Sequence, residues 1–598
     1  MLGLAACLVA CGGQPRNSAS SQPSPLAGEA VAGIADPGLR AIVGDHWEYV
    51  VRTSPVRATT VGDHRYDDRL APRDAASIEA VQAERNALLN RLIALNIGRL
   101  NEPDRVTHML LSSNLQAERA MDVCKFHEWN VDYANASVFG DLAYDVESFK
   151  AKTWRDAANL VARMGYGAKL VDDTIANLRI GLADGRVASG EKVRRAIAQL
   201  DQELGKPVDT WSMVHPAWTK PVTGDPWPAG ERERQARALH DLVATQIRPA
   251  IVRLRDFMRD TLLPKTRGDQ EGLVGVPDGD ACYRAAITYY VGLIKTPAEL
   301  HELGLAEIAR TDREIAGLGK TVLGAPDLAA TIARLRTDRK LYFESRDQLM
   351  AAAQTALDRA KAAIPKFFSV LPKTDCVTAE IPAYEAPYTT LAYYREPHLD
   401  GSKPGEFFVN TLSPETRARY ELEALTWHES IPGHHLQIAL AQELGSQMPL
   451  FRRLDGSTAF VEGWALYTER LADEMGLYTA DLDRLGKLSY DAWRGARLVV
   501  DTGIHALGWT RAQAEAYMRE HTALTETNIR NEVDRYIGWP GQALAYKVGQ
   551  LEILKLRHEA EQKLGKRFDI KAFHAVVLGA GAVSLPVLDE RVHAWIAK

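Results

Sequence analysis

Four residues within eight positions carry the chemistry that is most easily recognised in this sequence. His428, Glu429, His434 and His435 lie in the segment H-E-S-I-P-G-H-H. In the familiar H-E-x-x-H arrangement, two histidines four positions apart bind zinc from one face of a helix, and the glutamate between them activates water. Here the second histidine comes six or seven positions after the first. The spacing therefore predicts a related metal site with a different backbone path.

An uninterrupted helix would keep these histidines apart. A residue six positions after His428 would point to the opposite side, and one seven positions after it would lie about 10.5 Å along the axis. Pro432 breaks the helix, because it cannot donate to the carbonyl of residue 428 and its ring clashes with that carbonyl. Gly433 then permits unusual backbone angles. We expect this turn to bring His434 or His435 back toward His428, and we favour His434.

A third ligand is expected from the later segment F-V-E-G-W-A-L-Y-T-E-R, which contains Glu462 and Glu469. Two histidines and one carboxylate leave a zinc position open for water or substrate, as catalysis requires. We favour Glu462 as this ligand. Glu462 could instead accept a hydrogen bond from a ligating histidine, a role for which Glu469 and Glu423 are further candidates. Glu429 would be the general base that takes a proton from water and passes it to the leaving amine.

Several longer motifs resemble the family known as domain of unknown function 885, whose members are often bacterial lipoproteins. They are H-E-S-I-P-G-H-H-L-Q, V-E-G-W-A, D-T-G-I-H at 501–505 and W-P-G-Q-A-L-A-Y-K-V-G at 539–549. The resemblance runs from about residue 37 to the C-terminus. That family in turn resembles the gluzincin peptidases, a clan of mainly helical zinc enzymes in which two lobes enclose a deep channel. The resemblance implies activity on short peptides.

The resemblance also implies roles for particular residues. The expanded histidine motif is similar to the H-E-x-x-G-H of dipeptidyl peptidase III, where a lengthened helix still ligates zinc. V-E-G-W-A resembles the N-E-G-F-A of the M1-type aminopeptidases, whose glutamate is the third ligand, and this implies Glu462. Oligopeptidases of the clan stabilise the oxyanion with a downstream histidine and tyrosine. His505 and Tyr546 are the closest matches by position, with Tyr536 in reserve.

Other interpretations of the later residues remain open. His505 could be a buried histidine of the core, and Tyr546 could be a core aromatic residue. Arg494 and Arg497 could bind the terminal carboxylate of a substrate by a bidentate contact. We favour the simpler interpretation that both arginines belong to a solvated helix face.

The composition of the 598-residue chain limits its partners. A hydrophobic fraction of 46% and a charged fraction of 25% are typical of soluble globular proteins. The formal net charge of −6, with lysine and arginine spread along the chain, offers no basic surface for nucleic acid. No apolar run approaches the roughly 18 to 20 residues that cross a bilayer as a helix. We therefore expect no nucleic-acid partner. The histidine motif predicts Zn²⁺ as the cofactor, and the resemblance implies short peptides as substrates.

The first residues are typical of a bacterial lipoprotein signal. Residues 1–11 contain a short apolar stretch that ends in L-V-A-C, so they resemble a signal peptide whose lipobox cysteine, Cys11, becomes acylated. Residues 12–36 are rich in serine, proline, glycine and alanine, which predicts a flexible linker. We expect a periplasmic or cell-envelope lipoprotein that touches the membrane only through this anchor. Gly12 favours the outer membrane, because the aspartate that retains lipoproteins at the inner membrane is absent.

Residues 37–598 are predicted to form a mainly α-helical metallopeptidase-like domain, with the zinc-site region at about 405–550. A single core stops growing at this length, so we expect two or more helical lobes. The resemblance implies two helical lobes flanking a deep active-site cleft. A small β element is expected at 406–411, E-F-F-V-N-T, beside the metal-binding helix. As an edge strand, it would be a natural place for an extended peptide to add.

Capping signals predict where several helices begin. Thr296 with Glu299 and Thr510 with Gln513 have the spacing of capping boxes. Ser413, followed by proline, is expected to open the helix that carries the histidine motif.

The folded part contains three cysteines, Cys124, Cys282 and Cys376. They are too few for a disulfide scaffold and lack the C-x-x-C spacing of a metal site. A bridge between Cys282 and Cys376 is permitted in an oxidising compartment, and buried free thiols are the alternative.

These features together predict a zinc metallopeptidase of oligopeptidase or exopeptidase type. One alternative is a zinc hydrolase that acts on a non-peptide amide or ester. The other is a cell-surface lipoprotein that binds the metal without turnover.

Overall fold

The computed structural model describes residues 22–131, 137–219, 227–382, 386, 391–399, 401 and 403–598. The predicted signal peptide at 1–11, with Cys11, lies outside the described residues. The end of the predicted linker at 12–36 packs against the body. Ser24 Oγ donates to Oδ2 of Asp63 at 2.7 Å, and Ile34 is buried. The C-terminal part of this segment is therefore ordered structure and not a tether.

The chain is mainly helical, as the sequence predicts. The N-terminal part contains no β-strand among its described residues. Its helices are α1 (Ala27–Ala30), α2 (Pro37–Thr53), α3 (Pro55–Val61), α4 (Ala75–Ile93), α5 (Glu102–Met121), α6 (Phe126–Trp129), α7 (Val138–Ser148), α8 (Trp154–Met164), α9 (Gly167–Ala183), α10 (Gly190–Leu204), α11 (Glu231–Leu242) and α12 (Arg248–Phe257).

The C-terminal part holds the longer helices. Thr296 and Thr510 cap α14 and α22 with the capping boxes that their sequences predict. The helices are α13 (Gly279–Val291), α14 (Pro297–Leu323), α15 (Leu328–Thr337), α16 (Arg346–Ala363), α17 (Leu422–Glu429), α18 (His434–Glu443), α19 (Leu450–Leu454), α20 (Thr458–Glu474), α21 (Asp481–Ala506), α22 (Arg511–His521), α23 (Glu526–Gly538), α24 (Leu544–Leu564), α25 (Ile570–Leu578) and α26 (Leu585–Ile596).

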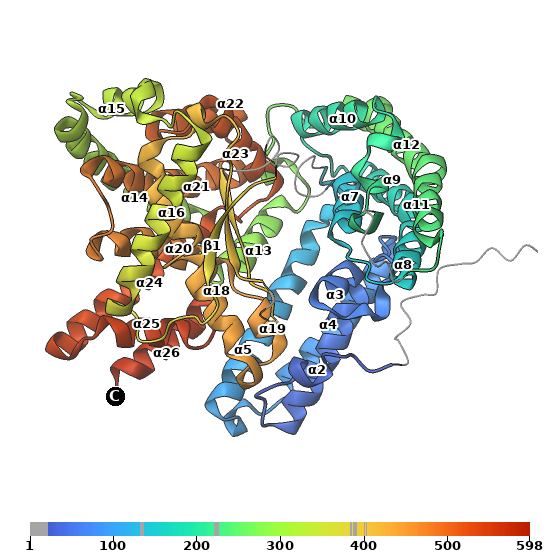
Figure 1. The fold of residues 1–598 in the computed structure, drawn as a ribbon, viewed down its shortest axis with the longest axis horizontal. Coiled ribbons are helices and arrows are strands. Elements are labelled where there is room, and N and C mark those ends of the chain that lie inside the picture. The colour runs from blue at the N-terminus through green and yellow to red at the C-terminus, as the bar shows by residue number, and fades with distance from the viewer. Residues whose placement is uncertain are drawn as a thin grey trace, which may run out of the picture.

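The helices form two lobes, with α7–α12 on one side of the molecule and α14–α26 on the other (Figure 1). The core of the N-terminal lobe includes Leu160 and Trp211. The core of the C-terminal lobe includes Trp427, Trp464 and Tyr467. The predicted pair of helical lobes is thus confirmed.

None of the described helices combines the length and the apolar character that a bilayer-spanning segment needs.

A disulfide joins Cys124, which follows α5, to Cys282 in α13. The bridge between Cys282 and Cys376, which the sequence permits, is not formed, because Cys376 is a buried free thiol at the start of a strand, as in the alternative that the sequence left open. The reason is the packing of helices that are far apart in the sequence. Helix α5 lies against α13, whereas the segment of Cys376 belongs to the small sheet.

The sheet has three strands, β1 (Cys376–Glu380), β2 (Ala392–Arg395) and β3 (Gly405–Val409), in the order β1-β3-β2. Strand β3 is parallel to β1 and antiparallel to β2. The predicted β element at 406–411 therefore exists, but it is the central strand and not an edge strand. Both sides of its backbone are already paired, and β2 is the outer strand that contacts α17.

Helices α20 and α24 pack with their backbones in contact. A Cβ atom added to Gly463 would lie 2.4 Å from the carbonyl carbon of Gly549, and one added to Gly549 would lie 1.8 Å from the carbonyl oxygen of Ala459. Larger residues at these positions would push the helices apart. The glycines therefore set the distance between the helix of Glu462 and the helix of Tyr546.

Candidate metal centre

The histidine motif lies at a break between two helices. Helix α17 ends at Glu429 and α18 begins at His434. The break comes at Pro432, as the sequence predicts, but the helix before it is shorter than expected. It begins at Leu422 and not near Ser413, which lies in the left-handed region with φ of 52° and makes no capping hydrogen bond. Short 3-10 turns occupy the stretch between them.

Gly433 is required in this turn because two backbone segments come close together. Its φ of −77° is accessible to other residues. A Cβ atom at this position, however, would lie 2.0 Å from the carbonyl oxygen of His428 and 2.3 Å from that of Trp427. The chain therefore folds tightly over the end of α17, which brings His434 to the side of His428.

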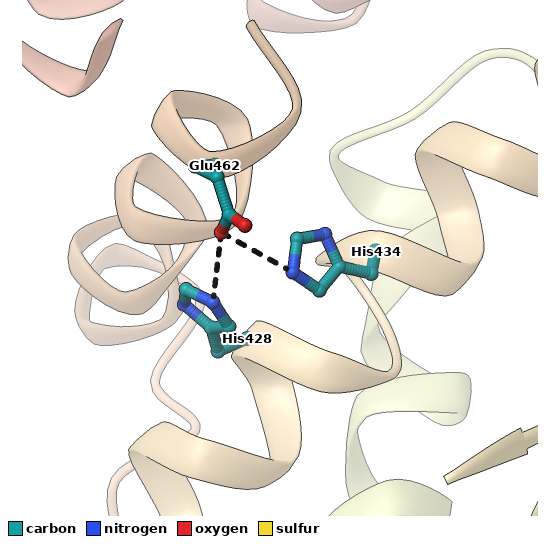
Figure 2. A group of neighbouring side chains, drawn as sticks. All are labelled: His428, His434 and Glu462. Carbon is teal, nitrogen blue, oxygen red and sulfur yellow. Dashed lines mark ion pairs between the residues drawn. The ribbon is translucent and has the colours of Figure 1, made fainter. Parts of the chain in front are cut away.

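The structure brings His428, His434 and Glu462 together (Figure 2). Each offers one ligand atom, and the three atoms lie within 4.8 Å of one another. The Nε2 atoms of His428 and His434 lie 3.7 and 3.6 Å from Oε2 of Glu462. Donors around a tetrahedral zinc ion, with bonds of about 2.1 Å, are roughly 3.4 Å apart. The side chains are therefore nearly in position to share one ion.

Two polar atoms of this group are buried without a hydrogen-bond partner in the described part of the chain. They are Oε2 of Glu462 and Nδ1 of His434. A buried carboxylate oxygen without a partner costs free energy, and a cation held by the three side chains would remove that cost. Two imidazoles and one carboxylate fit zinc and leave a position for water or substrate.

Glu469 orients the imidazole of His428 by a hydrogen bond. Nδ1 of His428 donates to Oε1 of Glu469 at 2.8 Å. This bond holds the imidazole in the tautomer whose Nε2 is free to bind a metal. The sequence left Glu469 and Glu423 as alternatives for such a role. Glu423 instead accepts from the backbone N–H of Thr479 at 3.0 Å.

His435 lies outside the group. Its Nδ1 is 2.9 Å from the hydroxyl of Tyr394, and its Nε2 donates to the carbonyl oxygen of Thr374 at 3.1 Å. Both ring nitrogens are therefore occupied. Of the two histidines that follow the break, only His434 shares the site with His428.

The three side chains of the group shift one another's pKa values. Burial lowers the pKa of His428, but the carboxylates of Glu462 and Glu469 outweigh it and raise the pKa to about 9. Burial raises the pKa of Glu462, but His428 and His434 outweigh it and lower the pKa to about 2. At His434 burial prevails and lowers the pKa to about 4. The pocket thus keeps Glu462 negative and favours a positive charge beside it.

Glu429 faces the same cavity. Burial is the main cause that raises its pKa to about 7, while His428 lowers it, Glu462 raises it and Arg494 lowers it. The backbone of Tyr394 in β2 also lowers this pKa. A carboxyl group with a pKa near neutrality can both accept and release a proton.

A cavity of about 370 Å³, open to solvent, contains these groups. The lining residues that the structure describes all come from the C-terminal lobe, chiefly from β2, α17, α20 and α21. The lining residues are Leu391, Ala392, Tyr393, Tyr394, Leu425, His428, Glu429, His434, Ile438, Val461, Glu462, Tyr490, Trp493, Arg494, Arg497, Arg535 and Tyr546.

Of the two predicted tyrosines, Tyr546 lines this cavity and Tyr536 does not. The hydroxyl of Tyr546 accepts from Nη2 of Arg535 at 3.2 Å, and it lies near enough to Glu462 to help lower the pKa of that carboxyl group. The hydroxyl of Tyr536 donates to Oε2 of Glu532 at 2.7 Å. The structure therefore brings Tyr546, and not Tyr536, to the predicted site.

The structure does not bring His505 to the cavity. Its side chain is buried behind the wall, against the ring of Tyr283. Nδ1 accepts from the backbone N–H of Leu273 at 3.1 Å, and Nε2 donates to the carbonyl oxygen of Tyr536 at 2.9 Å. With both nitrogens bonded to the backbone, His505 has the environment of a core histidine.

The interpretation of Arg494 and Arg497 as a solvated face is wrong. Both are buried and both line the cavity. Helix α21 is buried on every side from Leu488 to His505 apart from Trp493, which is half-buried. The apolar and small residues around the two arginines, W-R-G-A-R-L-V-V, were the available signal, because a helix that is apolar all round is a buried one.

The chain belongs to the family described as bacterial protein of unknown function (DUF885), whose model matches residues 55–592. No curated protein matches it.

Solved structures with the same fold include two bacterial proteins that are named as candidate lipoproteins. One, from Colwellia psychrerythraea, is 26% identical, with a TM-score of 0.86, and the match covers 94% of this chain and 98% of that one. The other, of unknown function and from Shewanella oneidensis, is 20% identical, with a TM-score of 0.72 and coverage of 92% and 98%.

Proposed function

We propose that this protein is a zinc-dependent peptidase that hydrolyses peptide bonds in short peptides. The observation that carries the proposal is the convergence of His428, His434 and Glu462 at one point of a cavity wall that also contains Glu429. Two histidines, one carboxylate and a nearby glutamate are typical of catalytic zinc sites. The cavity of about 370 Å³ lies within the range for ligand pockets, which suits a short peptide.

When bound, zinc supplies Lewis-acid polarisation of the scissile carbonyl and of water. Glu429 takes a proton from the attacking water and delivers it to the leaving amine, a double role that fits its pKa of about 7. The hydroxyl of Tyr546 donates a hydrogen bond to the oxyanion. Glu469 holds the imidazole of His428 in its metal-binding tautomer.

The first experiment compares Glu429→Gln and His428→Ala with the wild-type protein. We expect zinc in the purified wild-type protein and in Glu429→Gln, but loss of turnover in Glu429→Gln by a factor of about 10² to 10⁴. His428→Ala should lose both zinc and turnover. Glu423→Gln is a matched control on the same helix, since Glu423 does not line the cavity.

Three outcomes would contradict this proposal. If Glu429→Gln keeps full turnover, or if the wild-type protein binds no zinc, the catalytic centre is misassigned. If only esters or non-peptide amides are hydrolysed, the reaction stands and the substrate class is wrong.

The protein is also proposed to be a cell-envelope lipoprotein, anchored in the outer membrane through acylated Cys11. The signal-like residues 1–11 support this, and so do the names of the two structural relatives. Labelling with a fatty acid should modify the wild-type protein but not Cys11→Ser, and membrane fractionation should recover the label with the outer membrane.

A further inference from the structure

Arg494 is a buried cation in the cavity wall, and much of its hydrogen-bonding capacity is unused. Arg494 as a whole residue is only 4% exposed to solvent. Within the described part of the chain, Nε and Nη1 have no hydrogen-bond partner. Nη2 lies 3.9 Å from Oε1 of Glu469, which is too far for a hydrogen bond, and that oxygen already accepts from His428.

Aromatic rings hold the guanidinium of Arg494 in place. Its central carbon lies 4.6 Å from the ring centroid of Tyr490 and 4.4 Å from that of Trp493. Such stacking orients a guanidinium but leaves its N–H edge available to a ligand. Tyr490 also lines the cavity, and its hydroxyl is buried without a partner among the described residues.

The other two arginines of the cavity each donate two hydrogen bonds to side chains, although Nη1 of Arg497 has no partner among the described residues. Arg497 donates from Nε to the hydroxyl of Tyr536 at 3.1 Å and from Nη2 to Glu532 at 2.9 Å. Arg535 donates to Oε1 of Gln542 at 2.9 Å and to Tyr546. A buried cation without a hydrogen-bonded partner raises the free energy of the folded protein. An anionic ligand at the unpaired nitrogens of Arg494 would lower it.

We propose that Arg494 and Tyr490 bind the free carboxylate at the C-terminus of the substrate, so that the enzyme removes residues from that end of short peptides. The planar edge of a guanidinium matches a carboxylate with two parallel hydrogen bonds, and the tyrosine hydroxyl can supply a third. Arg494 lies close enough to the centre for its charge to lower the pKa values of Glu429 and His434. This assignment rests on the proposed peptidase function.

Cleavage then takes place on the N-terminal side of the anchored fragment. The peptide C–N bond breaks, the hydroxyl of water joins the carbonyl carbon, and a proton passes through Glu429 to the leaving nitrogen. The fragment held by Arg494 is therefore the leaving amine, and it keeps its carboxylate throughout.

The direct test uses three peptides of the same length with zinc-loaded wild-type protein. The first has a free C-terminal carboxylate, the second has a C-terminal amide, and the third is amidated but has aspartate as its last residue. We expect kcat/KM for the free acid to exceed that for the plain amide by about 10- to 100-fold. Equal values would overturn the proposal. If the amidated peptide that ends in aspartate is cleaved in preference to the other two, Arg494 and Tyr490 bind acidic side chains. That result would overturn the assignment of the site to the C-terminal carboxylate.

Variants test the residue itself. Arg494→Gln should bring the ratio of acid to amide close to one, mainly through a higher KM, and Arg494→Lys should restore part of it. Arg497→Gln, one turn along the same helix, is the matched control and should keep the ratio. Zinc content and thermal midpoint show that each variant is folded. A ratio that survives in folded Arg494→Gln would overturn the role of Arg494.

Binding separates this proposal from the proposed function. If the wild-type protein cleaves no peptide, the peptidase function fails, and the carboxylate site is tested by calorimetric titration with an N-acetylated dipeptide acid and its amide. Selective binding of the acid, lost in Arg494→Gln, would uphold the site. Equal binding of acid and amide would overturn it.

Discussion

Nδ1 of His428 donates to Oε1 of Glu469 at 2.8 Å, and both side chains are buried. The other ring nitrogen faces Glu462 across 3.7 Å. One imidazole is therefore held between two carboxylates, one that orients it and one that is placed to share a metal ion with it. This arrangement makes the site depend on a residue that does not itself reach the proposed metal position.

Glu469→Gln should weaken zinc binding about 10- to 100-fold, because the neutral amide no longer supports the basicity of His428. Competition with a chelator measures the affinity. Glu423→Gln, which changes a carboxylate outside the cavity, should leave it unaltered. Equal zinc affinity in Glu469→Gln and the wild-type protein would show that the hydrogen bond has no influence on the metal.

Gly433→Ala should destabilise the protein by about 1–3 kcal/mol and reduce its zinc content, because the added methyl group meets the backbone of α17. Urea unfolding and metal analysis measure the two effects. Gly317→Ala, in α14, is the control. A Cβ atom there meets nothing within 4 Å, so alanine should stabilise the helix by about 0.5–1 kcal/mol. If Gly433→Ala changes neither the stability nor the zinc content, the turn has another shape.

Acid should destabilise the protein partly through His574. Its Nδ1 donates to the carbonyl oxygen of Phe367 and its Nε2 accepts from the hydroxyl of Tyr467, both at 2.9 Å. Burial lowers its pKa to about 4, the hydrogen bond to Phe367 opposes this, and Arg557 adds to it. The pKa in the unfolded chain is about 6.5, so the unfolded state takes up the proton first as the pH falls.

The stability that His574 contributes above pH 6.5 should therefore be lost between about pH 6.5 and 4, up to roughly 3 kcal/mol. Urea unfolding at pH 7.5 and 4.5 measures the loss. His574→Gln, which has no such titration, should lose less stability over the same range. The same loss in both proteins would exclude His574 as a source.

Peptide mapping without reductant should recover Cys124 joined to Cys282, while Cys376 reacts with an alkylating agent only after unfolding. Replacing both bridged cysteines by alanine should lower the free energy of unfolding by about 2–4 kcal/mol. A reducing agent should lower the thermal midpoint of the wild-type protein but not that of the double variant. A mapped bridge to Cys376 would contradict the structure.

Features that depend on a few neighbouring residues could be predicted from the sequence. Pro432 and Gly433 act directly on the backbone, so the break between α17 and α18 was predictable. The capping boxes at Thr296 and Thr510 are local for the same reason. The preference for Glu462 came from a motif resemblance, because nothing near a carboxylate in the sequence indicates which histidines it will meet.

Contacts between distant segments were less predictable. His505 was matched by its position along the chain, but its ring nitrogens bond to Leu273 and Tyr536 behind the cavity wall. Arg494 was assigned to solvent because charged residues usually lie there, although its helix is buried on nearly all sides. The packing of the helices decides where His505 and Arg494 lie. The periodicity of the sequence does not show which helices pack together.

The contact between Gly463 and Gly549 also bears on protein engineering. Because the two backbones touch, neither α20 nor α24 can accept a bulkier residue there without moving Glu462 relative to Tyr546. Strand β2 and helix α21 contribute other parts of the wall and hold none of the three proposed ligands. Redesign for new substrates should therefore vary β2 and α21 and leave the glycine-packed helices as they are.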